Sequence, residues 1–361
     1  MPGVNVISEA RFDKSINLSK LISDSIDTYF YSWARKTPCG SYAECFEVHK
    51  ASDFWVYSLN ETSYTNFDVA MLSRPAGYTT VSMRSKMTFD LGYFAARVVL
   101  PPTASNGPWI LFGFESDDWF VGGVAHWGYY INDGTLRATV GGFNGTVFNN
   151  LTGFKPSDAT SAYHVYEIMV KPWGIFHAID GNIRSIVIRG AGDTPSSSSN
   201  LLTVPGRFVM AHTQNLPTKN LAVLLDIDGG STSVKWVWNS IHPWGLRVGE
   251  MDKDTPISTP LFNGSNGSWP VGNSVSAGSS WISMPFPALG RSIVAFAASS
   301  SGTLTIQLYN PGPNAWYNYQ TFSINADTYY VIEIKNALQF ARVVYTPSAN
   351  ATIRDAHVIM I

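Results

Sequence analysis

The chain has 361 residues and a formal net charge of −2, with 24 Lys and Arg residues against 26 Asp and Glu residues. This balance leaves no basic surface of the kind that binds nucleic acid, so we do not expect nucleic acid as a partner. Charged residues make up only 14% of the chain, against about 25% in typical soluble domains. Few charges, 14% aromatic residues, 30 Gly and 20 Pro are typical of an all-β protein with many turns.

The N-terminal residues lack a basic start followed by an apolar segment, so the sequence predicts no signal peptide. No run approaches the roughly 18 apolar residues that a membrane span needs. Seven Asn-X-Ser/Thr sequons and an abundance of Asn, Ser and Thr nevertheless indicate an extracellular type of surface. Two explanations stay open: a signal peptide was removed, or the protein leaves the cell as a virion component does.

The chain has two cysteines, Cys39 and Cys45. Their spacing suits a small disulfide-closed loop, and two unpaired thiols in a reducing compartment are the alternative. The seven histidines are scattered, and no cysteine or histidine spacing predicts a zinc or other transition-metal site.

The first expected elements are short. Apolar residues at helical spacing predict a short helix over 18–26, with an opening strand over 28–33 as the alternative. Three strands are expected next, over 43–48, 54–58 and 69–73.

Residues 79–114 show the clearest strand pattern. Residues 81–89 and 93–100 alternate between apolar and polar residues on either side of Gly92, which predicts strands with one buried face. The compact apolar run 109–114 is typical of a strand buried on both faces.

Turn residues predict the following hairpins. Asn132-Asp133-Gly134 separates strands over 124–131 and 135–141, and Asn-Asp-Gly is a strong hairpin signal. Two further strands meet at Lys171–Gly174, and a second turn is expected at Asp180-Gly181-Asn182. The closing strands of this part are expected over 207–211, 222–227 and 233–238.

Two segments carry a resemblance to a known family. The first segment contributes Ser85, Lys86, Phe89, Gly92, Phe94, Ala96, Arg97, Leu100, Pro101 and Trp109. The second contributes Tyr163, His164, Tyr166, Ile168, Trp173, Asp180 and Gly181. Together they resemble the concanavalin A-like lectin/glucanase superfamily, and within it the laminarinase-type glycoside hydrolases of family 16. The resemblance implies a jelly-roll β-sandwich over about two thirds of the chain, and it speaks to architecture before activity.

We therefore expect an all-β chain of two sandwiches. The concanavalin A-like sandwich with its N-terminal lead-in spans 1–248, a polar linker with two prolines spans 249–260, and a smaller sandwich or jelly roll spans 261–361. The strands of the smaller sandwich are expected over 280–284, 292–298, 303–309, 317–324, 329–334, 341–345 and 357–361.

The resemblance implies a catalytic motif E-x-D-x-x-E, because alternate residues of one strand share a face and can flank one glycosidic bond. Glu115 and Asp117 match the first two positions, whereas Trp119 and Phe120 stand where the second glutamate should be. Asp118 points to the opposite face of a regular strand. An acidic strand end without hydrolytic activity is the main interpretation, and a divergent hydrolase using Glu115 with Asp117 or Asp118 is the alternative.

Aromatic residues follow this motif. Trp119, Trp127 and Tyr129 are candidate sugar-stacking residues, because flat rings with a polar edge suit the C–H faces of sugars. Alternation places Trp127 and Tyr129 on one face of a strand and Tyr130 on the other. Ordinary sandwich core, or an interface with another subunit, is the alternative for these rings.

No cofactor is expected, apart from a possible structural calcium ion. Asp226 and Asp228, followed by two glycines, offer oxygen ligands, and relatives in the resembled family often bind calcium structurally. The sequence lacks the further carboxylates of a full calcium loop, so a strand-end turn is the alternative.

The leading hypothesis is a non-enzymatic structural or attachment protein at the outside of the cell or on a virion, as a capsid, turret, spike or fibre component. Its expected partners are copies of itself and neighbouring shell or surface proteins, because obligate interfaces carry few charges. Cell-surface glycans are a further candidate partner. The alternatives are a secreted lectin-like carbohydrate-binding protein and the divergent glycoside hydrolase.

Overall fold

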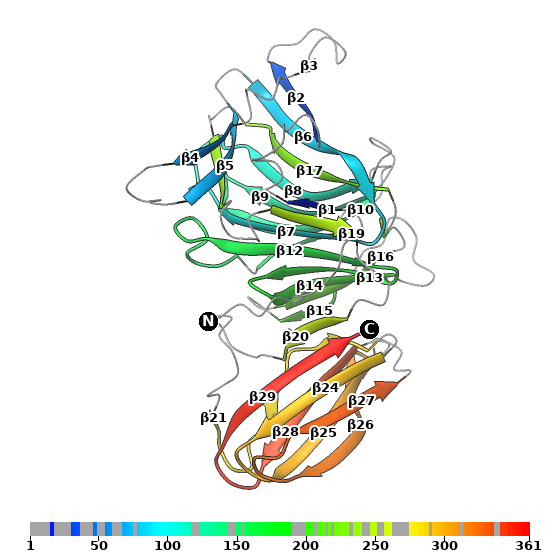
Figure 1. Ribbon diagram of the computed structural model, residues 1–361. Coiled ribbons are helices and arrows are strands. Elements are labelled where there is room, and N and C mark those ends of the chain that lie inside the picture. The colour runs from blue at the N-terminus through cyan, green and yellow to red at the C-terminus, as the bar shows by residue number, and fades with distance from the viewer. Residues whose placement is uncertain are drawn as a thin grey trace. The chain divides into compact units, whose positions relative to one another are not determined.

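The computed structural model describes residues 15–17, 30–36, 46–48, 55–59, 67–74, 78–116, 123–142, 149–153, 155–189, 200–204, 208–213, 216–217, 220–230, 234–239, 246–250, 256–261, 274–288, 291–310, 313–335 and 340–361. Every regular element within these residues is a β-strand, as the composition predicts (Figure 1). The chain divides into two compact units, Arg11–Lys253 and Asp254–Ile361 with Met1–Ala10. The described residues contain no helix of the length and apolarity that crossing a membrane requires.

The first unit contains an eight-stranded sheet with the strand order β11-β10-β9-β8-β17-β6-β2-β3. Its strands are β11 (Asn149–Leu151), β10 (Thr135–Gly142), β9 (Gly123–Tyr130), β8 (Trp109–Ser116), β17 (Leu221–Asp228), β6 (Tyr78–Phe89), β2 (Phe30–Lys36) and β3 (Phe46–Val48). All pairings in it are antiparallel. Strand β17 therefore lies between β8 and β6, two strands that precede it in the chain by more than 100 residues.

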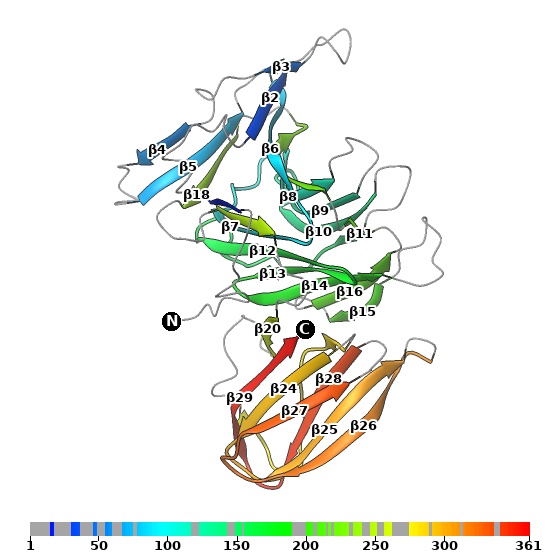
Figure 2. The ribbon, with the colours of Figure 1, turned by 45° about the vertical axis from the view of Figure 1, so that its right-hand side comes forward.

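The second sheet of this unit has eleven strands in the described residues, with the order β15-β16-β14-β13-β12-β7-β18-β5-β4 (Figure 2). Off this path, β19 pairs with both β1 and β7. Its strands are β15 (Asn200–Val204), β16 (Phe208–Thr213), β14 (Asn182–Arg189), β13 (Gly174–Ile179), β12 (His164–Lys171), β7 (Gly92–Val99), β18 (Val234–Asn239), β5 (Phe67–Arg74), β4 (Trp55–Leu59), β19 (Leu246–Glu250) and β1 (Ser15–Asn17).

The core of the first unit lies between these two sheets. Every second residue of β7 and β12 faces every second residue of β8 and β9, as the alternation requires. Phe112 contacts Tyr166 with ring centroids 5.5 Å apart, and Trp127 contacts Tyr166 at 5.7 Å, both edge to face. These contacts join the two sheets directly, and burial of such rings is the main stabilising contribution to a sandwich.

The predicted hairpins are confirmed. Tyr130 pairs with Thr135 across the Asn-Asp-Gly turn, where Gly134 has a φ of 69° and Asp133 accepts a hydrogen bond from the Thr135 amide. Strands β13 and β14 meet at Asp180 and Gly181, whose φ values of 52° and 73° fit a tight two-residue turn.

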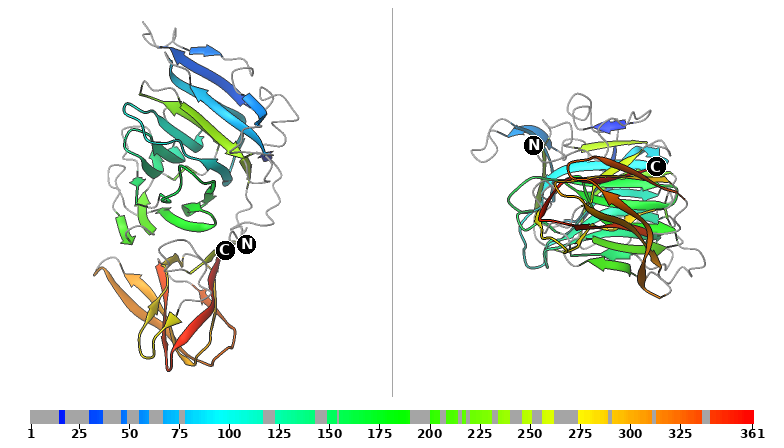
Figure 3. Two further views of the ribbon diagram at one scale, coloured as in Figure 1. Left: turned by 90° about the vertical axis from the view of Figure 1, so that its left-hand side faces the viewer. Right: turned by 90° about the horizontal axis from the view of Figure 1, so that it is seen from below.

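The second unit is a smaller β-sandwich, which Figure 3 shows from two further directions. One sheet has the order β20-β29-β24-β27, with β21 paired to β29, and the other has the order β22-β28-β25-β26, with β23 paired to β28. The strands are β20 (Ile257–Pro260), β21 (Ser274–Val275), β22 (Trp281–Ile282), β23 (Phe286–Pro287), β24 (Arg291–Ala298), β25 (Gly302–Asn310), β26 (Ala315–Ile324), β27 (Tyr330–Lys335), β28 (Phe340–Pro347) and β29 (Ala351–Met360). Phe296 of the first sheet contacts Trp281 and Tyr345 of the second, which closes the core between them.

Some predicted features lie outside the described residues. They are the short helix over 18–26 and the disulfide-closed loop between Cys39 and Cys45. The strand expected over 43–48 is described as the shorter β3, and the last strand begins at Ala351, six residues earlier than expected.

Candidate functional site

The candidate site lies on the face of the eight-stranded sheet that points away from the core. Residues of β8, β9 and β10 that alternate with the core residues form this face. A side chain added at Gly128 would meet Leu111 and Tyr130 at 3.4 Å and His126 at 3.9 Å, so these residues are neighbours. We call the group the outer patch, and it consists of Trp109, Leu111, His126, Gly128, Tyr130 and Arg137.

One side of the outer patch is a stack of aromatic and cationic groups. The Trp109 ring is 43% exposed and contacts the Tyr130 ring, with centroids 5.1 Å apart. The Arg137 guanidinium lies 3.8 Å from the centroid of the Tyr130 ring and 3.6 Å from the Asp133 carboxylate. The stack fixes the orientation of three long side chains and leaves the indole of Trp109 in contact with solvent.

His126 forms the buried part of the outer patch. It is 7% exposed, and burial lowers its pKa to about 4, so the ring is neutral at pH 7. Its Nδ1 atom is buried and has no hydrogen-bond partner. A neutral imidazole nitrogen accepts or donates one hydrogen bond, and the buried Nδ1 atom shares its lack of a partner with the buried Tyr129 hydroxyl and the Nε atom of Arg137 in the same sheet.

The neighbouring His177 is a core residue of the opposite sheet. Its Nε2 atom lies 3.2 Å from the His126 carbonyl oxygen, and its Nδ1 atom lies 3.2 Å from the Ser185 hydroxyl. Because a carbonyl oxygen only accepts, Nε2 carries the proton and Nδ1 accepts from Ser185. Burial, with a smaller contribution from His126, lowers the pKa of His177 to about 3.

The structure corrects the prediction that Trp127 and Tyr129 stack on sugars. Both have no exposed surface and belong to the core between the sheets, and the Trp127 indole donates a hydrogen bond to the Glu167 carbonyl oxygen. The prediction that Trp127 and Tyr129 share one face of the strand, opposite to Tyr130, is confirmed. The face that these two rings share is the inner one, however, and Tyr130 is on the outer one. The third candidate, Trp119, lies outside the described residues.

The candidate catalytic carboxylates are only partly described. Glu115 is half-buried near the end of β8, whereas Asp117 and Asp118 lie outside the described residues. Glu115 pairs with Ala222 of β17 and Leu111 pairs with Asp226. Glu115 and Asp226 are therefore four positions apart along the sheet, about 14 Å at 3.4 Å per residue. Glycosidase carboxyl groups lie about 5–9.5 Å apart, so this backbone separation does not favour a catalytic pair. The hydrolase hypothesis depends on Asp117 or Asp118 and stays a prediction.

The calcium candidates Asp226 and Asp228 lie at the end of β17. Gly229 and Gly230 follow with φ values of 68° and 60°, which describes a strand-end turn. Within the described parts of the chain, no three His, Cys, Asp or Glu side chains are grouped so that they could hold a metal ion. The calcium site stays a prediction.

Sequence reasoning missed most of the outer patch. The sequence pattern marked Trp109 only as a residue that determines the fold, and it predicted no functional role for Arg137 or His126. The signal was available in the alternation of β9, because a face that excludes Trp127 and Tyr129 must contain His126 and Tyr130.

No protein-family model matches the chain, and no curated protein matches it. Among solved structures, the chain is similar in fold to the laminarinase from Rhodothermus marinus, with 13% identity, a TM-score of 0.42, and coverage of 68% of this chain and 98% of that one. It is also similar to a glycoside hydrolase family 16 endo-glucanase from Bacteroides ovatus, with 13% identity, a TM-score of 0.44, and coverage of 65% and 98%. These enzymes are of the family that the sequence resembles. Because the TM-scores are below 0.5, we base the function on this chain's own residues.

Proposed function

We propose that this protein binds carbohydrate through the outer patch of its first unit and does not hydrolyse it. The observation that carries the proposal is the solvent-exposed indole of Trp109, held against Tyr130 on a sheet face that also presents Arg137. An exposed ring braced by a second ring offers a rigid apolar plane to the C–H face of a sugar, at little cost in side-chain entropy.

Polar groups beside that plane supply hydrogen bonds. Arg137 offers guanidinium donors beside the Trp109–Tyr130 pair, and Asp133 next to it offers carboxylate acceptors. Gly128 adds no side chain between His126 and Tyr130, so the Leu111 and Tyr130 side chains close over the sheet there. A small number of placed polar groups around an apolar plane is the usual composition of a small-molecule site.

The test uses isothermal titration calorimetry of the full chain. The probes are β-1,3-glucan and β-1,3-1,4-glucan oligosaccharides and mucin O-glycans, because structures similar in fold include a β-1,3-1,4-glucanase and a protein described with endo-acting O-glycanases for mucin breakdown. We expect at least one probe to bind, and Trp109→Ala to weaken its binding by more than about tenfold. Tyr329→Ala, which removes a 54% exposed ring of the second unit, is the matched control and should bind normally.

Absence of binding to every probe, or equal binding by wild type and Trp109→Ala, contradicts the proposal. Release of reducing sugar from a bound probe by wild type but not by Glu115→Gln would replace it with the hydrolase hypothesis. The location outside the cell or on a virion, and partnership with copies of itself or with shell proteins, stay predictions.

A further inference from the structure

A second aromatic and polar face lies on the other unit. In the sheet containing β25, β26 and β28, Leu304, Ile306 and Val343 point into the core. The alternate residues point outward. We call the following group the Arg342 face: Arg342 of β28, Gln307 of β25, and Trp316 and Asn318 of β26, together with the buried Tyr309 of β25 that contacts Trp316.

Hydrogen bonds order three polar side chains in a row across three adjacent strands. The Arg342 Nε atom donates to the Gln307 side-chain oxygen at 2.7 Å, and the Gln307 side-chain nitrogen donates to the Asn318 side-chain oxygen at 2.9 Å. These two bonds occupy the side-chain oxygens of Gln307 and Asn318, which are the acceptors of the row. The terminal amino groups of Arg342 and the amide nitrogen of Asn318 remain as outward donors. It therefore presents donors at defined positions before any ligand binds.

An aromatic surface adjoins this row. The Arg342 guanidinium lies 4.3 Å from the centroid of the Trp316 ring, and Tyr309 contacts the same ring at 5.2 Å. The Tyr309 hydroxyl in turn donates to the Asn314 side chain at 2.5 Å. These contacts hold the indole in one orientation on the sheet, which limits the entropy lost when a ligand ring packs on it.

No acidic side chain among the described residues compensates the charge on this face. Arg342 is the one charged residue in the sequences of β25, β26 and β28. Among the described residues it makes no ion pair, whereas Arg291 and Arg354 of the same unit lie beside Glu333 and Asp327. Partial burial lowers the pKa of Arg342, but a guanidinium remains charged at any physiological pH. A half-buried cation without an anion is complementary to an anionic ligand.

We propose that the Arg342 face binds an acidic glycan, with a sugar ring on Trp316 and its carboxylate on the terminal amino groups of Arg342. A carboxylate matches the planar guanidinium, and a hydroxyl of the same sugar matches the Asn318 amide. A neutral sugar would leave the guanidinium without its counter-charge. The inference concerns a different unit and a different sugar class from the proposed function, so the two can fail separately.

The experiment titrates the full chain with three carboxylated probes: oligogalacturonate, hyaluronan oligosaccharides and sialyllactose. Galacto-oligosaccharides and lactose are the neutral counterparts. We expect one acidic probe to bind, and Arg342→Gln and Trp316→Ala each to weaken it by more than about tenfold, since each removes a central contact. Arg354→Gln removes the same charge from an exposed position of the same unit and should leave the affinity unchanged.

Trp109→Ala should also leave the affinity for the acidic probe unchanged, which separates this site from the outer patch. Thermal unfolding of Arg342→Gln, a near-isosteric change on an outward face, should show a folded second unit. No binding by any acidic probe, equal binding of the neutral counterpart, or equal losses with Arg342→Gln and Arg354→Gln would each overturn the proposal.

Discussion

The imidazole of His164 lies 2.6 Å, Nδ1 to Oδ2, from the carboxylate of Asp180, which sits in the left-handed first position of the β13–β14 turn. The other Asp180 oxygen accepts the amide of Val165, so one aspartate joins the turn to the start of β12. The Nε2 atom of His164 lies 3.1 Å from Asp158. A ring between two carboxylates donates from both nitrogens and is therefore held in its charged form.

His164 should make the stability of the first unit depend on pH. Burial acts to lower the pKa of His164, but the hydrogen bond and charge of Asp180 and the charge of Asp158 outweigh it, so the pKa is raised. Its contribution is fully present below about pH 6.5 and is lost as the pH rises through the folded-state pKa. Urea unfolding should show this loss in wild type and a flatter profile in His164→Gln, which lowers stability by about 2 kcal/mol at low pH. Equal profiles would contradict the ion-pair role.

The buried His126 should have the opposite effect on stability: the free energy of unfolding should fall as the pH becomes acidic. The pKa of His126 is lowered to about 4, so the unfolded chain binds the proton first and stability falls as the pH drops from about 6.5. A shift of this size corresponds to about 3 kcal/mol between pH 7 and pH 4. The difference in unfolding free energy between wild type and His126→Gln, measured across that range, isolates this contribution.

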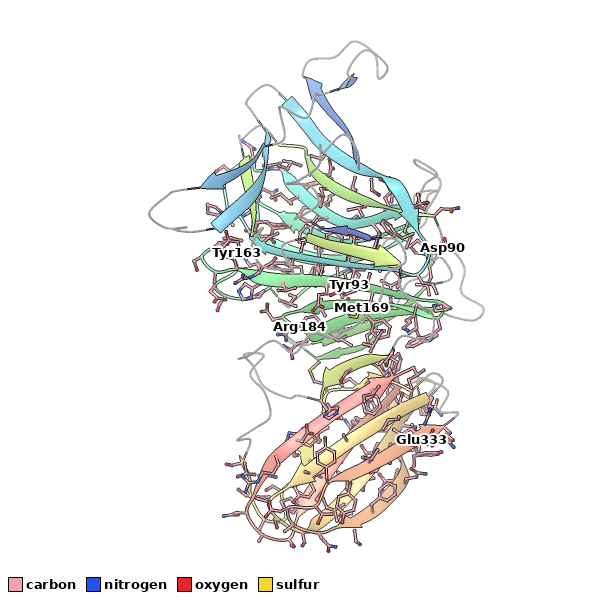
Figure 4. All side chains as sticks on the ribbon, in the orientation of Figure 1. Asp90, Tyr93, Tyr163, Met169, Arg184 and Glu333 are labelled. Atoms are coloured by element: carbon pink, nitrogen blue, oxygen red, sulfur yellow. The ribbon has the colours of Figure 1, made fainter. Side chains whose placement is uncertain are left out.

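The comparison of wild type with His126→Gln is needed because Glu167 titrates in a pH range that overlaps the range of His126. Burial raises its pKa to about 7, although Tyr93 (labelled in Figure 4) and the Gly181 amide both donate hydrogen bonds to its carboxylate. The folded state therefore holds this proton more tightly, and stability from Glu167 falls as the pH rises from about 4.5 to 7. In wild type alone, the pH-dependent contributions of His126 and Glu167 to the unfolding free energy would partly cancel each other.

Trp127 and Trp109 should respond in contrasting ways to substitution. Trp127→Ala removes a fully buried ring and should cost about 3–5 kcal/mol of unfolding free energy. Trp109→Ala removes an exposed ring and should change stability by less than about 1 kcal/mol while it weakens glycan binding. Chemical denaturation of both variants is the measurement, and similar losses would contradict the assignment of Trp127 to the core and Trp109 to the outer patch.

Gly92 should not tolerate a side chain. A Cβ atom at this position would lie 2.5 Å from the Phe114 ring, in the core between the sheets. We expect Gly92→Ala to lower the unfolding free energy by about 1–3 kcal/mol, because the ring must move in a packed core. Gly128→Ala is the matched control in the same unit, since its nearest contacts are 3.4 Å, and it should alter glycan binding more than stability.

Local sequence signals determined the elements. Alternating residues marked β7 and β9, and the Asn-Asp-Gly and Asp-Gly turns fixed the hairpins, because side-chain period and turn conformation depend on neighbouring residues alone. The same alternation correctly placed Trp127 opposite to Tyr130. The compact apolar run over 109–114 predicted β8 itself, but its expected burial on both faces is wrong, because Trp109 is 43% exposed on the outer face. The flanking acidic residues did not yield a described catalytic pair.

The tertiary structure decided which side of each strand is the core, and so which rings are exposed. Alternation is symmetric between the two faces of a strand, and only packing against β12 and β13 makes the Trp127 side the inner one. Likewise, Arg342, Gln307 and Asn318 come from three strands, and the sequence pattern contains no information on which strands become neighbours. Both candidate sites are products of sheet pairing and sheet packing, which depend on contacts between residues far apart in the chain.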